Sequence, residues 1–267
     1  MLTRLHHELR LFLVAVQFFT RVPVPAWVGF SPAWLQASAR HFPGVGLCVG
    51  TVGAVVLASA WGLTSPLVAV VLSMMATVVL TGAFHEDGLA DTCDALGGHV
   101  SRARALEIMK DSRIGSYGTV GLVLVLGLKA ALLASLPLAL AVPALIFGHT
   151  VSRGAAVVLL RTLPYAGDAD QSKAKPLATG VSSGGLLAAL GWVAFTAAAM
   201  AAWQFAWAAP LLLSTALVAA GTWACRRWWL GRLGGFTGDT LGATQQLTEC
   251  LALLGWLVWL RAMGWGA

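Results

Sequence analysis

The sequence predicts an all-α integral membrane protein, a polytopic helical bundle, from two observations. The chain has 267 residues, of which 58% are hydrophobic and only 10% charged, and its mean hydropathy is +0.79. Soluble domains are nearer a quarter charged. Seven apolar segments also have, or nearly have, the length of about 20 residues that a helix needs to cross a bilayer. These segments are 42–62, 66–84, 117–136, 142–160, 184–206, 209–225 and 247–264.

The connections between these segments alternate in charge. Nearly all the mid-chain charges lie in three connections, which are residues 85–116, 161–183 and 226–246. The other three carry none, and they are residues 63–65, 137–141 and 206–208. Because Lys and Arg concentrate in cytoplasmic loops, the charged connections and residues 1–41 are expected on the cytoplasmic side of the membrane. The net charge of +6 then reflects topology, and no nucleic-acid partner is expected.

Residues 9–20, at the N-terminal end, are apolar but too short for an ordinary span. Basic residues precede this segment, and Arg21 and two prolines follow it. The pattern predicts an interfacial or re-entrant helix, with a short eighth span as the alternative. No internal repeat or linker is visible, so residues 1–267 are expected to form a single membrane-embedded domain. The four cysteines are far apart in sequence and predict neither disulfides nor a zinc site.

A cluster of acids directly after the second apolar segment predicts a metal site. Six of the eleven carboxylates lie between Glu86 and Asp111. Asp87, Asp91 and Asp94 are spaced i, i+4, i+7 and would share one face of a helix, where they would repel one another. Oxygen ligands without His or Cys favour Mg²⁺ or Mn²⁺, and Mg²⁺ often binds together with substrate phosphates. The alternative is a solvated helix face whose acids interact with the helix dipole.

Glycines and polar residues around this acidic segment suggest its surroundings. Gly97 and Gly98 are expected to end the helix, and Gly88 to permit close approach of a ligand or a neighbouring helix. Farther along, Lys110, Arg113 and Ser116 are suitable phosphate donors. The alternative is that the two cations only anchor the next span at the membrane surface.

A second motif, GGFTGDTLGA, contains Thr237, Asp239 and Thr240. Its glycines predict a tight loop that opens a helix, with Asp239 or Thr240 as the cap. Capping alone is one interpretation; the other is a fourth acid that faces the first cluster, or a nucleotide contact. A basic zone suited to phosphates or lipid headgroups is formed by Arg153, Arg161, Lys173 and Lys175.

The motifs HEDGLADTCDALGG (from His85) and EIMKDSRIGSYG (from Glu107) closely resemble the cobalamin synthase family, adenosylcobinamide-GDP ribazoletransferase. The resemblance extends over most of the chain. Further segments that carry it are RVPVP, FPGVGLCVG and LGGFTGDTLGATQQLTE, which begin at Arg21, Phe42 and Leu233.

The resemblance implies a membrane-embedded, Mg²⁺-dependent enzyme that joins adenosylcobinamide-GDP to α-ribazole or its 5′-phosphate and releases GMP. It implies that Glu86 or one of the aspartates is the general base, with His85 a weaker candidate. Lys110 and Arg113 would then hold the diphosphate. The preferred form of ribazole and the oligomeric state, a homo-oligomer included, stay open.

Two other functions compete with this interpretation. A CDP-alcohol phosphotransferase also combines clustered aspartates with Mg²⁺, but it places two later aspartates at a wider spacing that this chain lacks. A secondary transporter would use an intramembrane acidic coupling site, and it should show repeated halves.

Overall fold

The structure, a computed structural model, describes residues 2–167 and 180–264, and these residues are mainly helical. Its long helices are α1 (Leu2–Phe19), α3 (Phe42–Trp61), α4 (Pro66–Thr81), α5 (Phe84–Gly97), α7 (Ser116–Ala134), α8 (Leu138–Thr162), α9 (Ser183–Trp203), α10 (Ala208–Leu233) and α11 (Gly238–Ala262). The short ones are α2 (Pro32–Ser38), α6 (Arg102–Ile108) and the 3-10 turns Ala26–Val28, Ala39–His41 and Phe205–Trp207. Within the described residues β structure is confined to one isolated bridge, between Tyr165 and Phe236.

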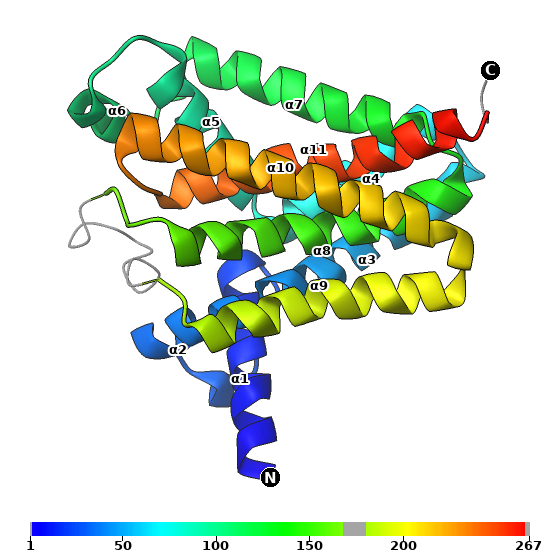
Figure 1. The fold of residues 1–267 in the computed structure, drawn as a ribbon, viewed down its shortest axis with the longest axis horizontal. Coiled ribbons are helices and arrows are strands. Elements are labelled where there is room, and N and C mark those ends of the chain that lie inside the picture. The colour runs from blue at the N-terminus through cyan, green and yellow to red at the C-terminus, as the bar shows by residue number, and fades with distance from the viewer. Residues whose placement is uncertain (1, 168–179, 265–267) are drawn as a thin grey trace.

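The helices form the predicted all-α membrane bundle (Figure 1). Five helical segments are long and apolar enough to cross a membrane, or six if α4 and α5 count as one bent span. The five are Pro32–Trp61, Ser116–Ala134, Leu138–Thr162, Ser183–Trp203 and Phe205–Leu233. The predicted span 247–264 lies in α11, which is not among them because Gln245, Gln246 and Glu249 make it more polar.

Some predicted boundaries were wrong. The neutral turn expected at 137–141 ends earlier, since α8 begins at Leu138. The charged connection expected at 226–246 is mostly helical, because α10 continues to Leu233 and α11 begins at Gly238. The extension of α10 to Leu233 contains Arg226, Arg227 and Arg232. A helix can continue past the apolar core when long charged side chains such as these extend to the polar surface.

The described parts of the three charged connections meet at one end of the bundle. Arg102 donates from Nε to the Leu233 carbonyl at 2.6 Å and from Nη2 to the Ala166 carbonyl at 2.9 Å. The bridge between Tyr165 and Phe236 joins the same two connections. Lys173 and Lys175 of the basic zone lie outside the described residues. The expectation that these connections share one side of the bundle is therefore confirmed for the residues described.

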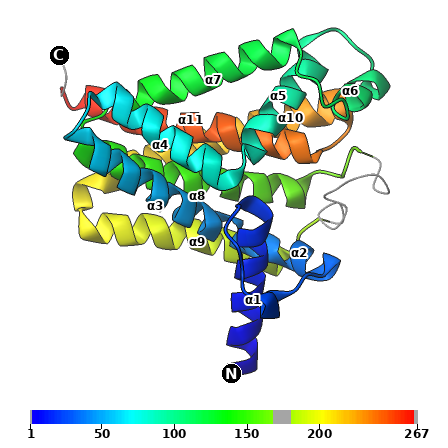
Figure 2. The same cartoon turned by 180° about the vertical axis from the view of Figure 1, so that it is seen from behind.

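The N-terminal helix α1 is longer than the predicted segment and projects from the bundle (Figures 1 and 2). Its C-terminal half packs inward through Leu11, Val14 and Phe19, whereas Leu5 is 69% exposed. It is not among the helices with the length and composition of a span. Its position at a membrane interface stays a prediction.

A sharp turn separates α4 from α5. Gly82 and Ala83 have φ values of +68° and +59°, both in the left-handed region. For Ala this conformation costs about 1–2 kcal/mol. The two helices are bent by 91° at this point (Figure 2), so the acidic α5 runs across the bundle instead of along it.

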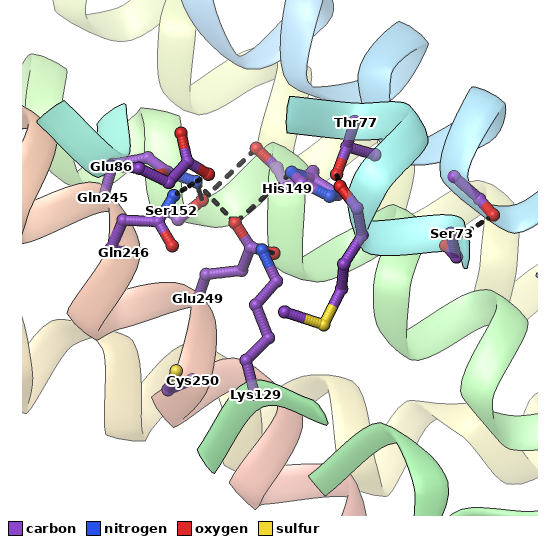
Figure 3. Close-up of polar contacts among 12 residues, drawn as sticks. Ser73, Thr77, Glu86, Lys129, His149, Ser152, Gln245, Gln246, Glu249 and Cys250 are labelled. Atoms are coloured by element: carbon purple, nitrogen blue, oxygen red, sulfur yellow. Dashed lines mark hydrogen bonds and ion pairs between the residues drawn. The ribbon is translucent and has the colours of Figure 1, made fainter. Parts of the chain in front are cut away.

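A buried polar network joins α7, α8 and α11 in the interior (Figure 3). Glu249, which has no exposed surface, pairs with Lys129 Nζ at 2.5 Å through Oε1. Its Oε2 lies 3.3 Å from His149 Nδ1 and accepts a hydrogen bond from Gln245 Nε2 at 2.6 Å. Gln245 Nε2 also donates to Ser152 Oγ at 3.1 Å. Each partner comes from another helix or the next turn, so the network fixes how the three helices pack.

We expect Lys129→Met to destabilise the bundle strongly, by about 3–5 kcal/mol, because it leaves Glu249 buried without its cation. Thermal unfolding of the purified protein in nanodiscs measures the effect. Arg104→Met is the matched control, since the Arg104 side chain is 58% exposed and its pair with Glu107 lies at the surface. Similar melting curves for both variants would show that the buried pair does not hold the helices together.

Candidate functional site

The acidic helix α5 crosses the start of α11 at two glycines. A Cβ on Gly88 would lie 2.9 Å from the Asp239 carbonyl oxygen and 3.0 Å from Asp239 Cα. A Cβ on Gly242 would lie 3.2 Å from the His85 carbonyl oxygen. The backbones therefore pack directly on each other, as glycines allow. This confirms the expectation that Gly88 permits close approach of a neighbouring helix.

This acidic crossing of α5 and α11 brings Asp239 next to Asp87 and Asp91. Burial, followed by the negative charges of Asp239, Asp87 and Asp94, raises the pKa of Asp91 to about 7. Burial and the charge of Asp87 raise the pKa of Asp239 to about 6. None of these three carboxylates has an ion-pair partner within the described residues. The prediction that the second motif places a fourth acid opposite the first cluster agrees with this arrangement.

Asp94, on the same face of α5, caps the start of α7. Its Oδ2 accepts from the Gly115 N–H at 2.7 Å and its Oδ1 from the Gly118 N–H at 2.8 Å. These N–H groups are among those that the first turn of α7 leaves without helical partners. Asp94 thus holds α7 against α5. Its role as a metal ligand stays a prediction, since each oxygen retains a further lone pair.

The cap of α11 was assigned to the wrong residue. Thr237, not Asp239 or Thr240, is the N-cap: its Oγ1 accepts from the Thr240 N–H at 3.2 Å. The Thr240 hydroxyl in turn accepts from the Thr237 N–H at 2.8 Å, so the two residues form a capping box. Thr237 and Thr240 therefore stabilise the first turn of α11 through these hydrogen bonds. Asp239 stands in the first turn without capping it, which leaves its carboxylate available to the acidic cluster.

The predicted phosphate donors follow α6 in the chain, from Lys110 to Ser116 at the start of α7. Arg113 is engaged locally: its Nη2 donates to Asp111 Oδ2 at 2.6 Å, and the Arg113 side chain is 87% exposed. This contact holds the pKa of the Asp111 carboxyl low, at about 2. Ser116 begins α7 and is exposed, and Lys110 is exposed after α6. Their assignment to the substrate stays a prediction.

His85 and Glu86 face the interior rather than the three aspartates. Glu86 is buried, and its Oε1 accepts from Gln246 Nε2 at 3.0 Å, while Oε2 has no partner in the described residues. The ring of His85 stacks on Phe19 with centroids 5.4 Å apart. These contacts connect the start of α5 with the buried network of Figure 3. The general base stays open among Glu86 and the aspartates.

The sequence patterns above do not single out the buried network. Lys129 could have indicated it, because this residue is a lone cation in an apolar segment. Ionisable residues inside a membrane are usually functional or paired. The polar pairs His149/Arg153 and Gln245/Glu249 are also spaced i, i+4, which places each pair on one helix face.

The donor chemistry of the acidic crossing fits Mg²⁺. Asp87, Asp91 and Asp239 offer only carboxylate oxygens, and their mutual repulsion is of the kind that a bound cation relieves. Among the described residues no three His, Cys, Asp or Glu side chains lie close enough to form a complete metal site by themselves. Mg²⁺ does not require one, because it commonly takes one or two carboxylates together with waters and substrate phosphates.

Comparisons with known proteins give one consistent family. The profile of the cobalamin-5-phosphate synthase family matches residues 11–257. An adenosylcobinamide-GDP ribazoletransferase of Leptothrix cholodnii is 61% identical over 262 residues, which cover 95% of this chain and 97% of the relative. The proteins of that name from Polaromonas naphthalenivorans and Vibrio cholerae are 46% and 43% identical, over 92% and 96% of this chain and 97% of each relative. No solved structure matches the chain.

We expect Gly88→Ala to disrupt the acidic crossing, because the new methyl group would meet backbone atoms of Asp239 that cannot move independently of α11. Turnover should fall at least about tenfold, with a lower melting temperature. Gly127→Ala in α7 is the control, since a Cβ there has no neighbour within 4 Å. If Gly88→Ala behaves like Gly127→Ala, close packing of α5 on α11 is not required.

Proposed function

This chain belongs to the cobalamin-5-phosphate synthase family, and we propose that it transfers the adenosylcobinamide phosphate group of adenosylcobinamide-GDP to α-ribazole or α-ribazole 5′-phosphate. GMP is released, and adenosylcobalamin or its 5′-phosphate is formed. The crossing of α5 and α11 is the observation that links the proposed reaction to particular residues. It gathers Asp87, Asp91 and Asp239 at one end of the bundle.

The reaction is an attack of a ribose hydroxyl on the phosphorus next to cobinamide. Negative charge is spread over the phosphate oxygens at the transition state, so catalysis consists mainly of positioning and neutralisation. Mg²⁺ held by one or two of the carboxylates of Asp87, Asp91 and Asp239, together with substrate phosphates, would supply that neutralisation. A carboxylate of α5 accepts the proton of the attacking hydroxyl. Asp94 positions α7 and its preceding loop relative to these groups.

The alternatives are less favoured. A CDP-alcohol phosphotransferase would belong to another family. A transporter is expected to carry its coupling acids near the middle of a span and to show repeated halves. Here the three aspartates belong to the charged end of the bundle, whereas the acid in its interior, Glu249, is tied to Lys129.

We further propose that the protein lies in the bacterial inner membrane with the acidic crossing on the cytoplasmic side. The support is the concentration of Lys and Arg in the connections at this end, set against the uncharged turns at the other. The exposed apolar side chains of α4, α7 and α9 would face lipid; examples are Val79, Val123 and Leu187.

We expect Asp239→Asn to reduce the rate of GMP release on the order of 100-fold, because it removes a carboxylate proposed to hold the cation that would neutralise the transition-state charge. The melting temperature should barely change, because Thr237 caps α11 and the lost helix-dipole interaction is worth only about 0.3–1 kcal/mol. Purified protein in nanodiscs is assayed with adenosylcobinamide-GDP, α-ribazole and Mg²⁺.

Glu107→Gln is the control for this experiment, since the Glu107 side chain is 69% exposed and its pair with Arg104 lies at the surface. Normal kinetics of Asp239→Asn would return this residue to a structural role. Absence of GMP release by the unmodified protein, with both substrates present, would overturn the proposed activity itself.

The orientation in the membrane is tested by single cysteines in a variant without Cys48, Cys93, Cys225 and Cys250. In intact cells an impermeant maleimide should label Thr64→Cys, in the uncharged turn, and not His99→Cys, at the charged end. Both positions are exposed, so His99→Cys should react once the cells are opened. The reverse pattern would place the acidic crossing outside the cytoplasm.

A further inference from the structure

A pocket of about 550 Å³, its open mouth included, adjoins the acidic crossing. Six aromatic rings from distant parts of the chain line it: Phe18, Phe19, Phe42, Phe84, Tyr165 and Phe236. Several of them stand edge to face, for example Phe19 and Phe42, with centroids 4.5 Å apart and planes at 87°. Such a lining offers both faces and edges for stacking on a flat ring.

The pocket also contains two polar groups whose hydrogen bonds are incomplete. Arg153 is only 2% exposed; its Nη1 donates to the His149 carbonyl at 3.0 Å, but Nε has no partner in the described residues. Gln245 is 1% exposed, and its Oε1 likewise has none there. Arg153 also has no carboxylate within ion-pair distance among the described residues. Buried polar atoms are costly to leave unpaired, so both atoms indicate a polar ligand.

The pocket and the acids are continuous along two helices. Gly238 and Gly242, on either side of Asp239 in the sequence, line the pocket. Phe84 and His85 line it as well and begin the helix that carries Asp87. A molecule bound among the aromatic rings would therefore lie against the first turn of α11, which carries Asp239.

We propose that this pocket binds the benzimidazole nucleoside substrate, with its flat base among the aromatic rings and its 5′-phosphate on Arg153. This assignment rests on the proposed function. A corrin carries several amide side chains that would need hydrogen-bond partners, and this lining supplies few. A guanine base would need several hydrogen-bond partners along its edge, and this lining is mainly hydrocarbon. A benzimidazole has almost no polar edge to satisfy.

Arg153 also gives the site a preference between the two forms of the acceptor. A buried guanidinium that hydrogen-bonds an anion makes a charge-assisted contact, which the nucleoside without phosphate cannot form. The phosphorylated form should therefore bind about ten times more tightly or better. The carbonyl and ring of His149 hold the guanidinium in place, and His149 is itself held by Glu249.

The base-binding part is tested with Tyr165→Leu and Phe84→Leu, two partly exposed members of the lining. Each should raise the KM for α-ribazole 5′-phosphate about tenfold, the scale of one lost stacking contact. The KM for adenosylcobinamide-GDP and the kcat should stay close to wild type. Phe205→Leu is the control, because this ring is 86% exposed and lies outside the pocket. A rise in the KM for adenosylcobinamide-GDP instead, or no change in either KM, overturns the assignment.

The phosphate-binding part is tested by calorimetry on the wild-type protein in nanodiscs, with no turnover required. Binding of α-ribazole 5′-phosphate at least about ten times tighter than α-ribazole supports the proposal, and a smaller ratio in Arg153→Lys locates the preference. Equal affinities in the wild type overturn it, as does displacement of the phosphorylated nucleoside by GMP. GMP release by the wild type, measured separately, distinguishes failure of this assignment from failure of the proposed function.

Discussion

A carboxylate with no exposed surface has to be neutralised where it lies, and in this chain that requirement organises the bundle around Glu249. Lys129 of α7, His149 of α8 and Gln245 of α11 satisfy its two oxygens. In an apolar bundle, helices can slide past one another at little cost, because one aliphatic contact resembles the next. A buried ion pair with hydrogen-bonded neighbours has one good geometry and a large penalty when a partner is missing. It sets the register of three helices, and the positions of Arg153 and of the start of α11 follow from that register.

The same register makes the acidic crossing possible. With α11 fixed, Gly242 and Gly88 let α5 lie directly against it, and the left-handed turn at Gly82 and Ala83 brings α5 across the bundle. Burial of the carboxylates, and then repulsion among Asp87, Asp91 and Asp239, oppose this contact, and both raise the pKa of Asp91 and of Asp239. Packing elsewhere must outweigh them. A site that is electrostatically unfavourable by itself and held together by its scaffold is a common property of catalytic centres.

The sequence predicted the features that depend on composition and local spacing. Hydropathy located five of the seven predicted spans, and a sixth if α4 and α5 count as one bent span. The glycines at 97 and 98 marked the end of α5, and the spacing of the aspartates placed them on one helix face. It failed where the outcome depended on distant contacts. Asp94 looked equivalent to Asp87 and Asp91, yet a loop some 20 residues later uses its oxygens. Thr237 was predicted to contact the substrate, and Asp239 or Thr240 to cap α11, whereas Thr237 and Thr240 form the capping box and Asp239 does not cap the helix. The aromatic pocket collects rings from α1, α3 and α5 and from the segments before α9 and α11, and no local pattern predicts such an assembly.

The charges of the buried network and those of the acidic crossing with its pocket thus differ in one respect: the first are paired and the second are not. In the interior, Lys129 and Glu249 compensate each other, and nothing is gained there by adding a ligand. Within the described residues, the three aspartates at the end of the bundle have no cation as ion-pair partner, and Arg153 in the adjoining pocket has no carboxylate partner. Each group lacks the charge that a metal ion or a phosphate would bring. A phosphorylated acceptor on Arg153 and a metal-bound diphosphate on the aspartates would complete both groups. In the proposed function, the uncompensated arginine and the uncompensated acids would together orient the two substrates towards each other.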